Sequence, residues 1–369
     1  MIPVFKPELT LADKFSVLNA LLKNNISGTS PIVSDFEKQY SSKFNRKFGV
    51  AVSNGSVALD VAFNLLNLNK DDEVIVPSFT IISCLSAIIR SGGKPVFCDV
   101  NEKTWNMTLE DVKSNFSEKT KAVLVVHTYG LAAEINKIQE FCKEKNIYLI
   151  EDAAEAHGQK IDNKPCGSYG DISVFSFYAN KHITTGEGGM VLTDSEEFYY
   201  NAQKIRNLDF NNEKRFSHDN FYWNYRLSGL QASLGISQLK NLNKTIEFKI
   251  KQGNYYTELL SKAENLVQLP LMEHEGVMNH YWVYGVLLKR ENIRDYVMNE
   301  LRNNGIETRP FFWPLHLQPA LPKEYKTTRK LLVSERLGSD GLYLPMGKHV
   351  NKNSQNKISE VLLRILEEN

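Results

Sequence analysis

Short apolar runs alternate with amphipathic segments between residues 48 and 152. Apolar runs with the length of strands cover 48–53, 73–77, 95–100, 121–127 and 148–152. Amphipathic segments with helical spacing cover 57–66, 81–89, 109–116 and 135–145. Runs such as VLVV and YLIE are apolar nearly throughout, which is typical of strands buried on both faces of a parallel sheet. The pattern predicts a doubly wound α/β domain, with helices on both faces of a mainly parallel sheet.

The pattern of apolar and polar positions changes in the second half of the chain. Helical patterns cover 196–206 and 229–251, and the second is long enough to link two domains. A strand over 281–288, a helix over 293–303, a strand over 307–312 and a closing helix over 354–369 then follow. Near the N-terminus, the spacing of Phe36, Tyr40 and Phe44 predicts a helix capped by Ser34 or Asp35. We expect a large α/β domain over 1–251 and a smaller α+β domain over 252–369.

Composition narrows the possible partners. The chain has 369 residues, of which 42% are hydrophobic, and a formal net charge of +1. This near-neutral balance gives no electrostatic case for nucleic acid or an acidic membrane surface. The N-terminus has no basic segment followed by a long apolar run, and no run approaches the roughly 20 apolar residues that span a bilayer.

The four cysteines give no sign of a metal site or a disulfide framework. Cys84, Cys98, Cys142 and Cys166 form no CxxC pair. We also find no set of histidine, cysteine and carboxylate residues with the spacing of metal ligands, so no metal is expected. A reducing cytoplasm fits this cysteine usage best.

The stretch 171–190, DISVFSFYANKHITTGEGGM, places a lysine between a buried strand and a glycine-rich turn. A burial-prone lysine loses its charge readily, and the neutral amine is a nucleophile towards carbonyl carbon. We therefore hypothesise that Lys181 forms a Schiff base with an aldehyde cofactor. The alternative is an ordinary surface lysine in a loop.

Two other strand ends carry polar residues, and ligands of doubly wound sheets bind at the carboxyl ends of the strands. After the first strand, the sequence SNGS at 53–56 opens a helix whose N-terminus favours an anion, although Ser53 or Asn54 alternatively only caps that helix. After the strand ending at Ile150, the sequence EDAAEAH places Asp152 where a carboxylate suits a pyridinium nitrogen. The alternative for that cluster is an acidic helix N-terminus.

Together, an anion cradle, a carboxylate and a nucleophilic lysine are the parts needed to hold pyridoxal phosphate. The carboxylate keeps the ring nitrogen protonated, and the lysine holds the aldehyde and carries a proton between carbon atoms. A nearby small residue such as Ala154 leaves room for a flat ring.

The motifs SNGSVAL, EVIVPSFT, EDAAEAHG, SFYANKHITTGEGGMVLT, NYRLS and RPFFWPLH occur in the order and near the spacing of the DegT/DnrJ-type sugar aminotransferases. The resemblance extends from Ile2 to the closing helix. It implies a fold type I pyridoxal-phosphate-dependent transferase, similar in architecture to aspartate aminotransferase. It also implies a homodimer whose two active sites lie across the interface.

The family pattern implies roles for individual positions. Lys181 corresponds to the Schiff-base lysine, and Asp152 pairs with the pyridinium nitrogen. The residues expected at the cofactor phosphate are Gly55, Ser56 and Ser176, with Asn224 from the neighbouring subunit. Ala154 lies near the ring, and Glu155 near the cofactor hydroxyl and the substrate.

The chain also departs from the family pattern. The family often has an aromatic residue after PSxT, where this chain has Ile81. An aliphatic contact from Ile81, or stacking by Phe79, is expected instead. The usual RNHG reads RNLD at 206–209, which weakens a role of that loop in substrate binding. A branch with histidine in place of the lysine consists of dehydratases, and Lys181 argues against that branch.

The resemblance implies transfer of an amino group from L-glutamate to a nucleotide-linked 4-keto-6-deoxy sugar. The lysine block is most similar to that of the branch making a GDP-linked 4-amino-4,6-dideoxy sugar for surface polysaccharide. One alternative is the same chemistry on a UDP- or dTDP-linked 3- or 4-keto sugar. Another is a regulator that keeps the fold without catalysis.

Three further residues are candidates for binding the substrate. His316 lies in a loop rich in aromatics and proline, where simple packing is the alternative. Arg226 and Arg309 carry planar guanidinium groups that fit two oxygens of a pyrophosphate, and structural ion pairs are the alternative.

Overall fold

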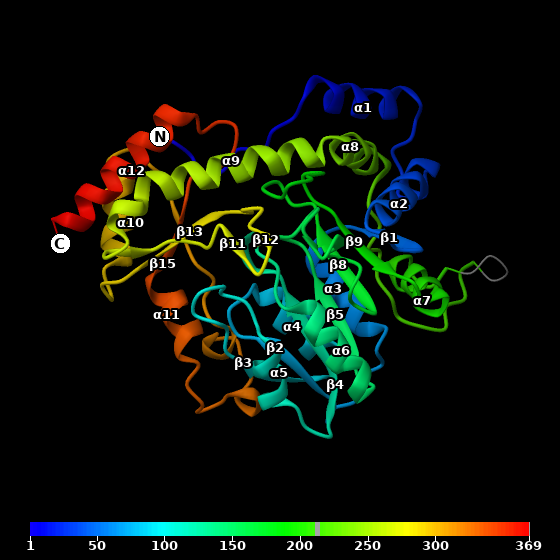
Figure 1. Ribbon diagram of the computed structural model, residues 1–369. Coiled ribbons are helices and arrows are strands. Elements are labelled where there is room, and N and C mark those ends of the chain that lie inside the picture. Colours follow the sequence, from blue (N-terminus) through cyan, green and yellow to red (C-terminus); the bar gives the residue numbers. More distant parts are fainter. Residues whose placement is uncertain (211–214, 369) are drawn as a thin grey trace.

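The computed structural model describes residues 1–210 and 215–368 (Figure 1). Its largest sheet has seven strands in the order β1-β9-β8-β5-β4-β2-β3. These strands are β1 (Phe48–Val52), β2 (Glu73–Pro77), β3 (Lys94–Cys98), β4 (Thr120–Val126), β5 (Tyr148–Asp152), β8 (Ile172–Ser176) and β9 (Gly189–Thr193). The strand β9 runs antiparallel to both of its neighbours, β1 and β8, while the pairs among β8, β5, β4, β2 and β3 are parallel. The expected mainly parallel sheet is confirmed.

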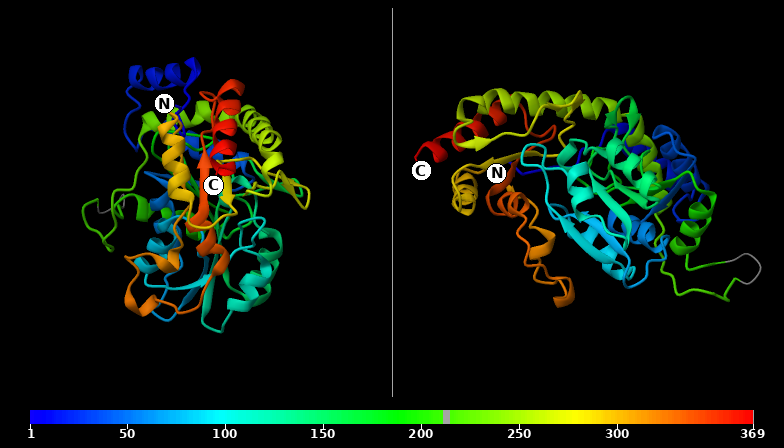
Figure 2. Two further views of the ribbon diagram at one scale, coloured as in Figure 1. Left: turned by 90° about the vertical axis from the view of Figure 1, so that its left-hand side faces the viewer. Right: turned by 60° about the horizontal axis from the view of Figure 1, so that its bottom comes forward.

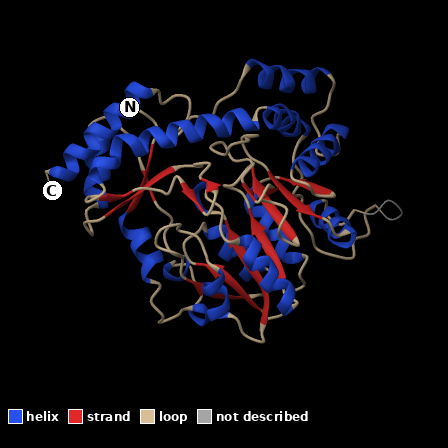
Figure 3. Cartoon of the chain, viewed as in Figure 1, coloured by secondary structure: helices blue, strands red, loops and turns tan. Residues whose placement is uncertain are grey.

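Helices cover both faces of the seven-stranded sheet (Figure 3). One face packs against α2 (Pro31–Lys43), α5 (Leu109–Asn115), α6 (Ile135–Lys145) and α8 (Gly229–Lys240). The other face packs against α3 (Gly55–Asn64), α4 (Ile82–Arg90) and α7 (Glu196–Arg206). Successive residues of β4 alternate between the two cores, with Val123 in the first and Leu124 in the second. The strands are therefore apolar because both of their faces are buried.

A smaller body lies beside the large sheet (Figures 1 and 2). Its four-stranded sheet has the order β10-β13-β15-β14. These strands are β10 (Val267–Gln268), β13 (Tyr284–Leu288), β14 (Arg309–Pro310) and β15 (Gly341–Leu344). The helices of this part are α10 (Arg294–Asn303), α11 (Leu332–Asp340) and α12 (Lys352–Glu367). Most of these elements enclose a separate apolar core, as expected for a second α+β unit.

The helix α9 (Leu242–Leu260) links the two bodies and runs through residue 251, where we placed the domain boundary. The pattern over 229–251 is divided between α8 and α9, because Asn241 leaves the helical conformation at φ −100° and ψ 1°. Ahead of α1 (Leu11–Leu22), the chain crosses to the small sheet, where Ile2 donates to the carbonyl of Gly305 (2.7 Å). The division into 1–251 and 252–369 stays a prediction.

Other element boundaries also differ from the expected ones. The helix α2 begins at Pro31 after Ser30, because proline is favoured in the first helical turn, so the expected caps Ser34 and Asp35 lie inside the helix. The strand expected over 307–312 is limited to β14, where Pro310 has no N–H for a ladder. Asn369 of the closing helix lies outside the described residues. Two short hairpins pair β6 (Lys160–Ile161) with β7 (Lys164–Pro165) and β11 (Glu273–His274) with β12 (Val277–Met278).

Within the part of the chain that the structure describes, no helix is long and apolar enough to cross a membrane.

Candidate active site

Lys181 lies in a closed loop that follows β8. The backbone N–H of Phe177 donates to the carbonyl of Gly188 (2.8 Å), which joins the two ends of the loop. Gly188 has φ 157°, and a Cβ there would lie 2.4 Å from Oγ1 of Thr185, so only glycine fits. The glycine-rich turn therefore holds the backbone around Lys181 in one arrangement.

The amine of Lys181 is buried beside a carboxylate and an aromatic ring. Its Nζ lies 3.4 Å from Oε1 of Glu155 and 3.5 Å from the centre of the Trp282 ring. Burial lowers the pKa of Lys181, although Glu155 and Asp152 oppose that change. Burial raises the pKa of Glu155 to about 7, although Lys181 and the N–H of Tyr129 oppose it. Burial therefore favours the neutral form of both groups, and their short separation allows a proton to pass between them.

Asp152 is the last residue of β5, which pairs directly with β8. Its Oδ1 accepts the N–H of Ala154 (3.0 Å), and its Oδ2 lies 3.6 Å from Sγ of Cys84, a weak donor. The ionised form of Asp152 therefore has few donors, and burial raises its pKa. A protonated ring nitrogen is the kind of partner that this carboxylate lacks.

The N-terminus of α3 lies against the end of β8. Asn54 caps the helix by accepting the N–H of Val57 (2.9 Å), as one alternative expected, and the amides of Gly55 and Ser56 remain at the terminus. A Cβ on Gly55 would lie 2.7 Å from Cβ and 3.1 Å from Oγ of Ser176. The missing side chain of Gly55 therefore lets the amides of α3 and the Ser176 hydroxyl face one small space.

These three groups fit pyridoxal phosphate. The helix terminus with Ser176 offers N–H and O–H donors for a phosphate, Asp152 offers a carboxylate for a pyridinium, and Lys181 offers an amine for an aldehyde. The three groups come from the ends of β1, β5 and β8, which lie in the same sheet. Each group thus matches the part of the cofactor that it would contact.

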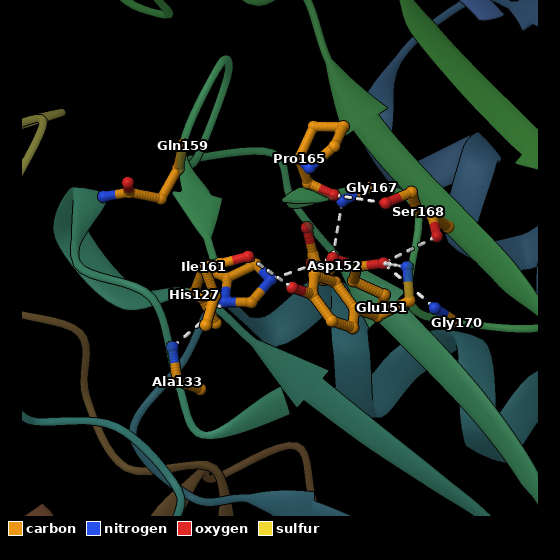
Figure 4. Close-up of polar contacts among 12 residues, drawn as sticks. His127, Ala133, Glu151, Asp152, Gln159, Ile161, Pro165, Gly167, Ser168 and Gly170 are labelled. Atoms are coloured by element: carbon orange, nitrogen blue, oxygen red, sulfur yellow. Dashed lines mark hydrogen bonds and ion pairs between the residues drawn. The ribbon is translucent and has the colours of Figure 1, made fainter. Parts of the chain in front are cut away.

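Glu151, the neighbour of Asp152, is the centre of a buried hydrogen-bond cluster (Figure 4). Its carboxylate accepts the N–H groups of Gly167, Tyr169 and Gly170 and the hydroxyl of Ser173. It also accepts Nε2–H of His127 (3.1 Å), whose Nδ1 accepts the N–H of Ala133 (3.1 Å). Burial alone would raise the pKa of Glu151, but these donors lower it to about 2.

The cluster around Glu151 includes a trio that sequence spacing did not indicate. The ligand atoms of His127, Glu151 and Cys166 lie within 4.8 Å of one another, close enough to suit a metal ion. Both carboxylate oxygens already accept hydrogen bonds from protein donors. We interpret the trio as a structural support for the strand end that carries Asp152.

Two residues after β2 were alternatives for contact with the cofactor ring. Phe79 is fully buried, and its ring packs against Tyr129, Phe311 and Phe312 with centroid distances of 5.7 to 6.0 Å. Ile81 is 41% exposed at the start of α4. Phe79 is enclosed by other aromatic side chains while Ile81 is open to solvent, and both contacts with the cofactor ring stay predictions.

The segment with Asn224 and Arg226 lies beside the end of β1. The N–H of Ser53 donates to the carbonyl of Tyr225 (2.8 Å), and Arg226 pairs with Val52. The guanidinium of Arg226 donates to Oδ1 of Asn207, and the Asn224 side chain is exposed. Both residues are therefore close to the SNGS turn, although far from it in sequence.

The other two substrate candidates have different surroundings. The Arg309 side chain is 53% exposed and forms an ion pair with Glu307 (2.7 Å). Arg309 also pairs across the small sheet with Tyr343, which lines the cavity next to Lys181. His316 is buried, with Nδ1 2.6 Å from Oγ of Ser78. The structure therefore brings Arg309 near the site and engages His316 in packing between the two bodies.

A cavity of about 330 Å³ opens beside Lys181, between the loop after β8, α9 and the small body. Its lining includes four further lysines, which are Lys6, Lys244, Lys249 and Lys348. Trp282 and Tyr343 line its other side. The sequence gives no sign that Tyr343, Lys249 or Trp282 belongs to the site, because only the tertiary fold brings their elements to Lys181.

Comparisons with known proteins agree with this geometry. The profile of the DegT/DnrJ/EryC1/StrS aminotransferase family matches residues 10–363. The chain is 36% identical to a GDP-perosamine synthase of Escherichia coli O157:H7 over 344 residues, covering 93% of each chain.

Solved structures show the same fold. The aminotransferase TlmJ of Streptoalloteichus hindustanus has a TM-score of 0.92 and 28% identity, with both chains fully covered. A mutant of the GDP-4-keto-6-deoxymannose-3-dehydratase ColD, with bound GDP-perosamine, has a TM-score of 0.90 and 24% identity over 98% of this chain and 100% of the other.

The match extends over nearly the whole chain, as the motif resemblance implied. The family's aminotransferases depend on pyridoxal phosphate, which is the cofactor that the donors at the ends of β1, β5 and β8 fit. The chain therefore belongs to the DegT/DnrJ/EryC1/StrS aminotransferase family, and its cofactor is pyridoxal 5'-phosphate.

Proposed function

We propose that this protein moves an amino group from L-glutamate to a nucleotide-linked 4-keto-6-deoxy sugar. The substrate would be GDP-4-keto-6-deoxymannose and the product GDP-perosamine. The observation that carries the proposal is the buried amine of Lys181, 3.4 Å from Glu155, in a chain 36% identical to a GDP-perosamine synthase. That relative favours a GDP-linked sugar over the UDP- and dTDP-linked alternatives.

In this proposal Lys181 holds the cofactor and carries the proton. When bound, pyridoxal phosphate supplies an aldehyde for the donor nitrogen and a ring that accepts electrons from the reacting carbon. Lys181 needs its neutral form to take a proton, and burial favours that form. Glu155, whose pKa is raised to about 7, would exchange the proton with Lys181 and would lie on the substrate side.

The remaining cofactor contacts follow from the strand ends. Asp152 would keep the ring nitrogen protonated, because a buried carboxylate gains from a cationic partner. The amides of Gly55 and Ser56 and the hydroxyl of Ser176 would hold the phosphate at the N-terminus of α3. Ala154 would lie near the ring. Substrate contacts by Arg226, Arg309 and His316 stay predictions, and the position of Arg309 beside Tyr343 supports its role best.

We propose that the protein works as a homodimer with shared sites. The helix α1 presents an outward row of apolar side chains between 47% and 75% exposed, namely Leu11, Phe15, Leu18 and Leu22. Trp223, beside Asn224, is 69% exposed. Such exposed apolar surface is typical of an interface, and a second copy would cover it. Asn224 would then contact the cofactor phosphate of the neighbouring subunit.

Mixing two variants tests the shared sites. If Asn224 acts across the interface, Lys181→Ala and Asn224→Ala protomers complement each other, because a mixed dimer contains one site with both residues intact. Mixing the two proteins under exchanging conditions should restore activity above that of either alone. A monomer in solution, or no gain on mixing, would contradict the shared site.

We place the reaction in the cytoplasm, in the synthesis of surface polysaccharide such as lipopolysaccharide O-antigen. The four cysteines are buried as free thiols, which agrees with a reducing compartment. The placement rests on the proposed GDP-linked substrate, because such activated sugars are donors for polysaccharide assembly.

The activity is tested with purified protein, pyridoxal phosphate, L-glutamate and a panel of GDP-, UDP- and dTDP-linked keto sugars. Mass spectrometry should detect an amino sugar from the GDP-linked 4-keto-6-deoxy sugar, and Lys181→Ala should give none. If a UDP- or dTDP-linked sugar is preferred, the substrate carries that nucleotide in place of GDP. If no keto sugar is aminated, a non-catalytic regulator becomes the better account.

A further inference from the structure

The amine of Lys181 lies over the face of an indole that comes from a distant part of the chain. Its Nζ is 3.5 Å from the centre of the Trp282 ring, with Glu155 at 3.4 Å. The side chain of Lys181 is 8% exposed, so little water competes with the ring for its charge. A cation over the face of tryptophan is attracted by the electrons of the ring, and the attraction grows when water is excluded.

Hydrogen bonds fix Trp282 in this position. Its indole N–H donates to the carbonyl of Asn180, the residue before Lys181 (3.2 Å). Its backbone N–H donates to the carbonyl of Tyr129 (3.0 Å), and its carbonyl accepts Nζ–H of Lys249 (2.8 Å). The ring also stacks on Phe312, with an interplanar angle of 16°. These contacts hold the ring of Trp282 with one face towards Lys181.

Lys249 adds an unusual contact to this arrangement. It is 9% exposed on α9, and its Nζ donates to the carbonyl of Trp282. This hydrogen bond anchors the backbone of Trp282 to the helix that links the two bodies, while burial and Lys181 lower the pKa of Lys249 to about 7. Trp282 thus connects three parts of the fold, which are the loop of Lys181, the short helical turn η1 (Thr128–Gly130) and α9.

Transamination requires such a place for the lysine. With the cofactor bound, the amine of Lys181 would be free during part of the reaction, and would have to move away and later return. A free, buried amine that moves without a partner would lose the orientation that proton transfer needs.

We propose that Trp282 is a positioning residue that receives the amine of Lys181 whenever the lysine is not attached to the cofactor, with Glu155 on its other side. The proposal rests on the proposed role of Lys181. By holding the charged amine, the indole favours the ammonium form of Lys181, which is the form that donates a proton. A tryptophan that only fills the core would leave the ionisation of Lys181 unchanged.

The test measures the ionisation of Lys181 directly. The full chain is loaded with pyridoxamine 5'-phosphate, which has no aldehyde and leaves Lys181 free. Trace acetic anhydride then labels amines at several pH values, and peptide mass spectrometry follows Lys181, with an exposed lysine in the same digest as reference. In Trp282→Leu the midpoint of Lys181 labelling should fall by about one pH unit, because the ammonium loses its stabilising ring. In Trp282→Phe the midpoint of Lys181 labelling should fall less, because a smaller aromatic ring remains.

A matched control is Trp313→Leu, which removes an exposed tryptophan of the 311–318 loop. It should leave the midpoint of Lys181 unchanged. If Trp282→Leu does not fold, the wild-type chain made with fluorinated tryptophan decides, because fluorine withdraws charge from the ring face with little change of volume. Its midpoint should fall as fluorine atoms are added.

An unchanged midpoint in folded Trp282→Leu, or in the fluorinated chain, would overturn the proposal. Failure of the proposed function gives a different result. In that case borohydride would not attach the cofactor to Lys181 in the pyridoxal form, whatever the labelling of the Trp282 variants.

Discussion

The Nζ of Lys181 lies 3.4 Å from Oε1 of Glu155, and both side chains are 8% exposed. Burial lowers the pKa of the lysine and raises the pKa of the glutamate to about 7, so it favours the neutral form of both groups. A surface pair of the same length would ionise fully and contribute little. The burial of this pair is therefore what suits it to proton transfer.

Removing the charge of Glu155 should change the pH profile of the reaction. Below pH 7 the carboxyl is protonated and no longer accepts a proton from Lys181. We expect the wild-type rate to fall as the pH drops below about 7. Glu155→Gln should be slower by about 100-fold and should lose that limb, because glutamine does not titrate. The control Glu187→Gln, in the exposed part of the same loop, should keep the wild-type profile.

The amide variant at Asp152 should disturb the cofactor more than the fold. Asparagine keeps an oxygen for the N–H of Ala154 but offers no charge to a ring nitrogen. We expect Asp152→Asn to bind pyridoxal phosphate with a rate of amino transfer lowered by at least about 100-fold. The absorbance of the bound cofactor should titrate at a different pH from wild type. A rate within a few-fold of wild type would remove Asp152 from the site.

A methyl group on Gly55 should weaken cofactor binding through the phosphate. The added Cβ would lie 2.7 Å from Cβ of Ser176, so α3 and the end of β8 would have to separate. We expect the dissociation constant of pyridoxal phosphate for Gly55→Ala to rise by more than tenfold, as measured by fluorescence titration. Ser56→Ala keeps both amides and loses only one hydroxyl, so its dissociation constant for pyridoxal phosphate should rise less. Equal effects would place the phosphate on the hydroxyl instead of the helix terminus.

Much of the fold and part of the site could be predicted from local sequence. The β5 strand was expected over 148–152 and found there, and Lys181, Asp152 and Gly55 follow strands whose ends meet at one edge of the sheet. Strand ends are readable because apolar runs end where polar residues begin. The sequence did not predict that Trp282 neighbours Lys181. Only tertiary packing brings the segment before β13 to the loop after β8. The break at Asn241 was missed because the apolar spacing continues across it.

Glu151 should matter for stability more than for chemistry. Glutamine would direct N–H groups at the amides of Gly167, Tyr169 or Gly170, leaving buried donors without acceptors. We expect Glu151→Gln to lower the free energy of unfolding by about 3–5 kcal/mol, measured by urea denaturation. The control Glu144→Gln breaks an exposed ion pair with Lys145 and should leave the free energy of unfolding almost unchanged.

The pH dependence of this stability has a definite sign. The pKa of Glu151 is lowered to about 2 in the folded chain, so its contribution is present above the unfolded value of 4.5. The contribution should disappear as the pH falls from about 4.5 through 2. Wild type should therefore lose stability over that range more steeply than Glu151→Gln. Parallel pH profiles would show that the carboxylate is not ionised in the fold.

The most direct test of the account is the covalent site of the cofactor. The full chain is loaded with pyridoxal phosphate, reduced with borohydride, digested and mapped by peptide mass spectrometry. The account predicts that the reduced cofactor is attached to Lys181, and that Lys181→Ala carries none. Attachment to another lysine of the same cavity, such as Lys249, would contradict it.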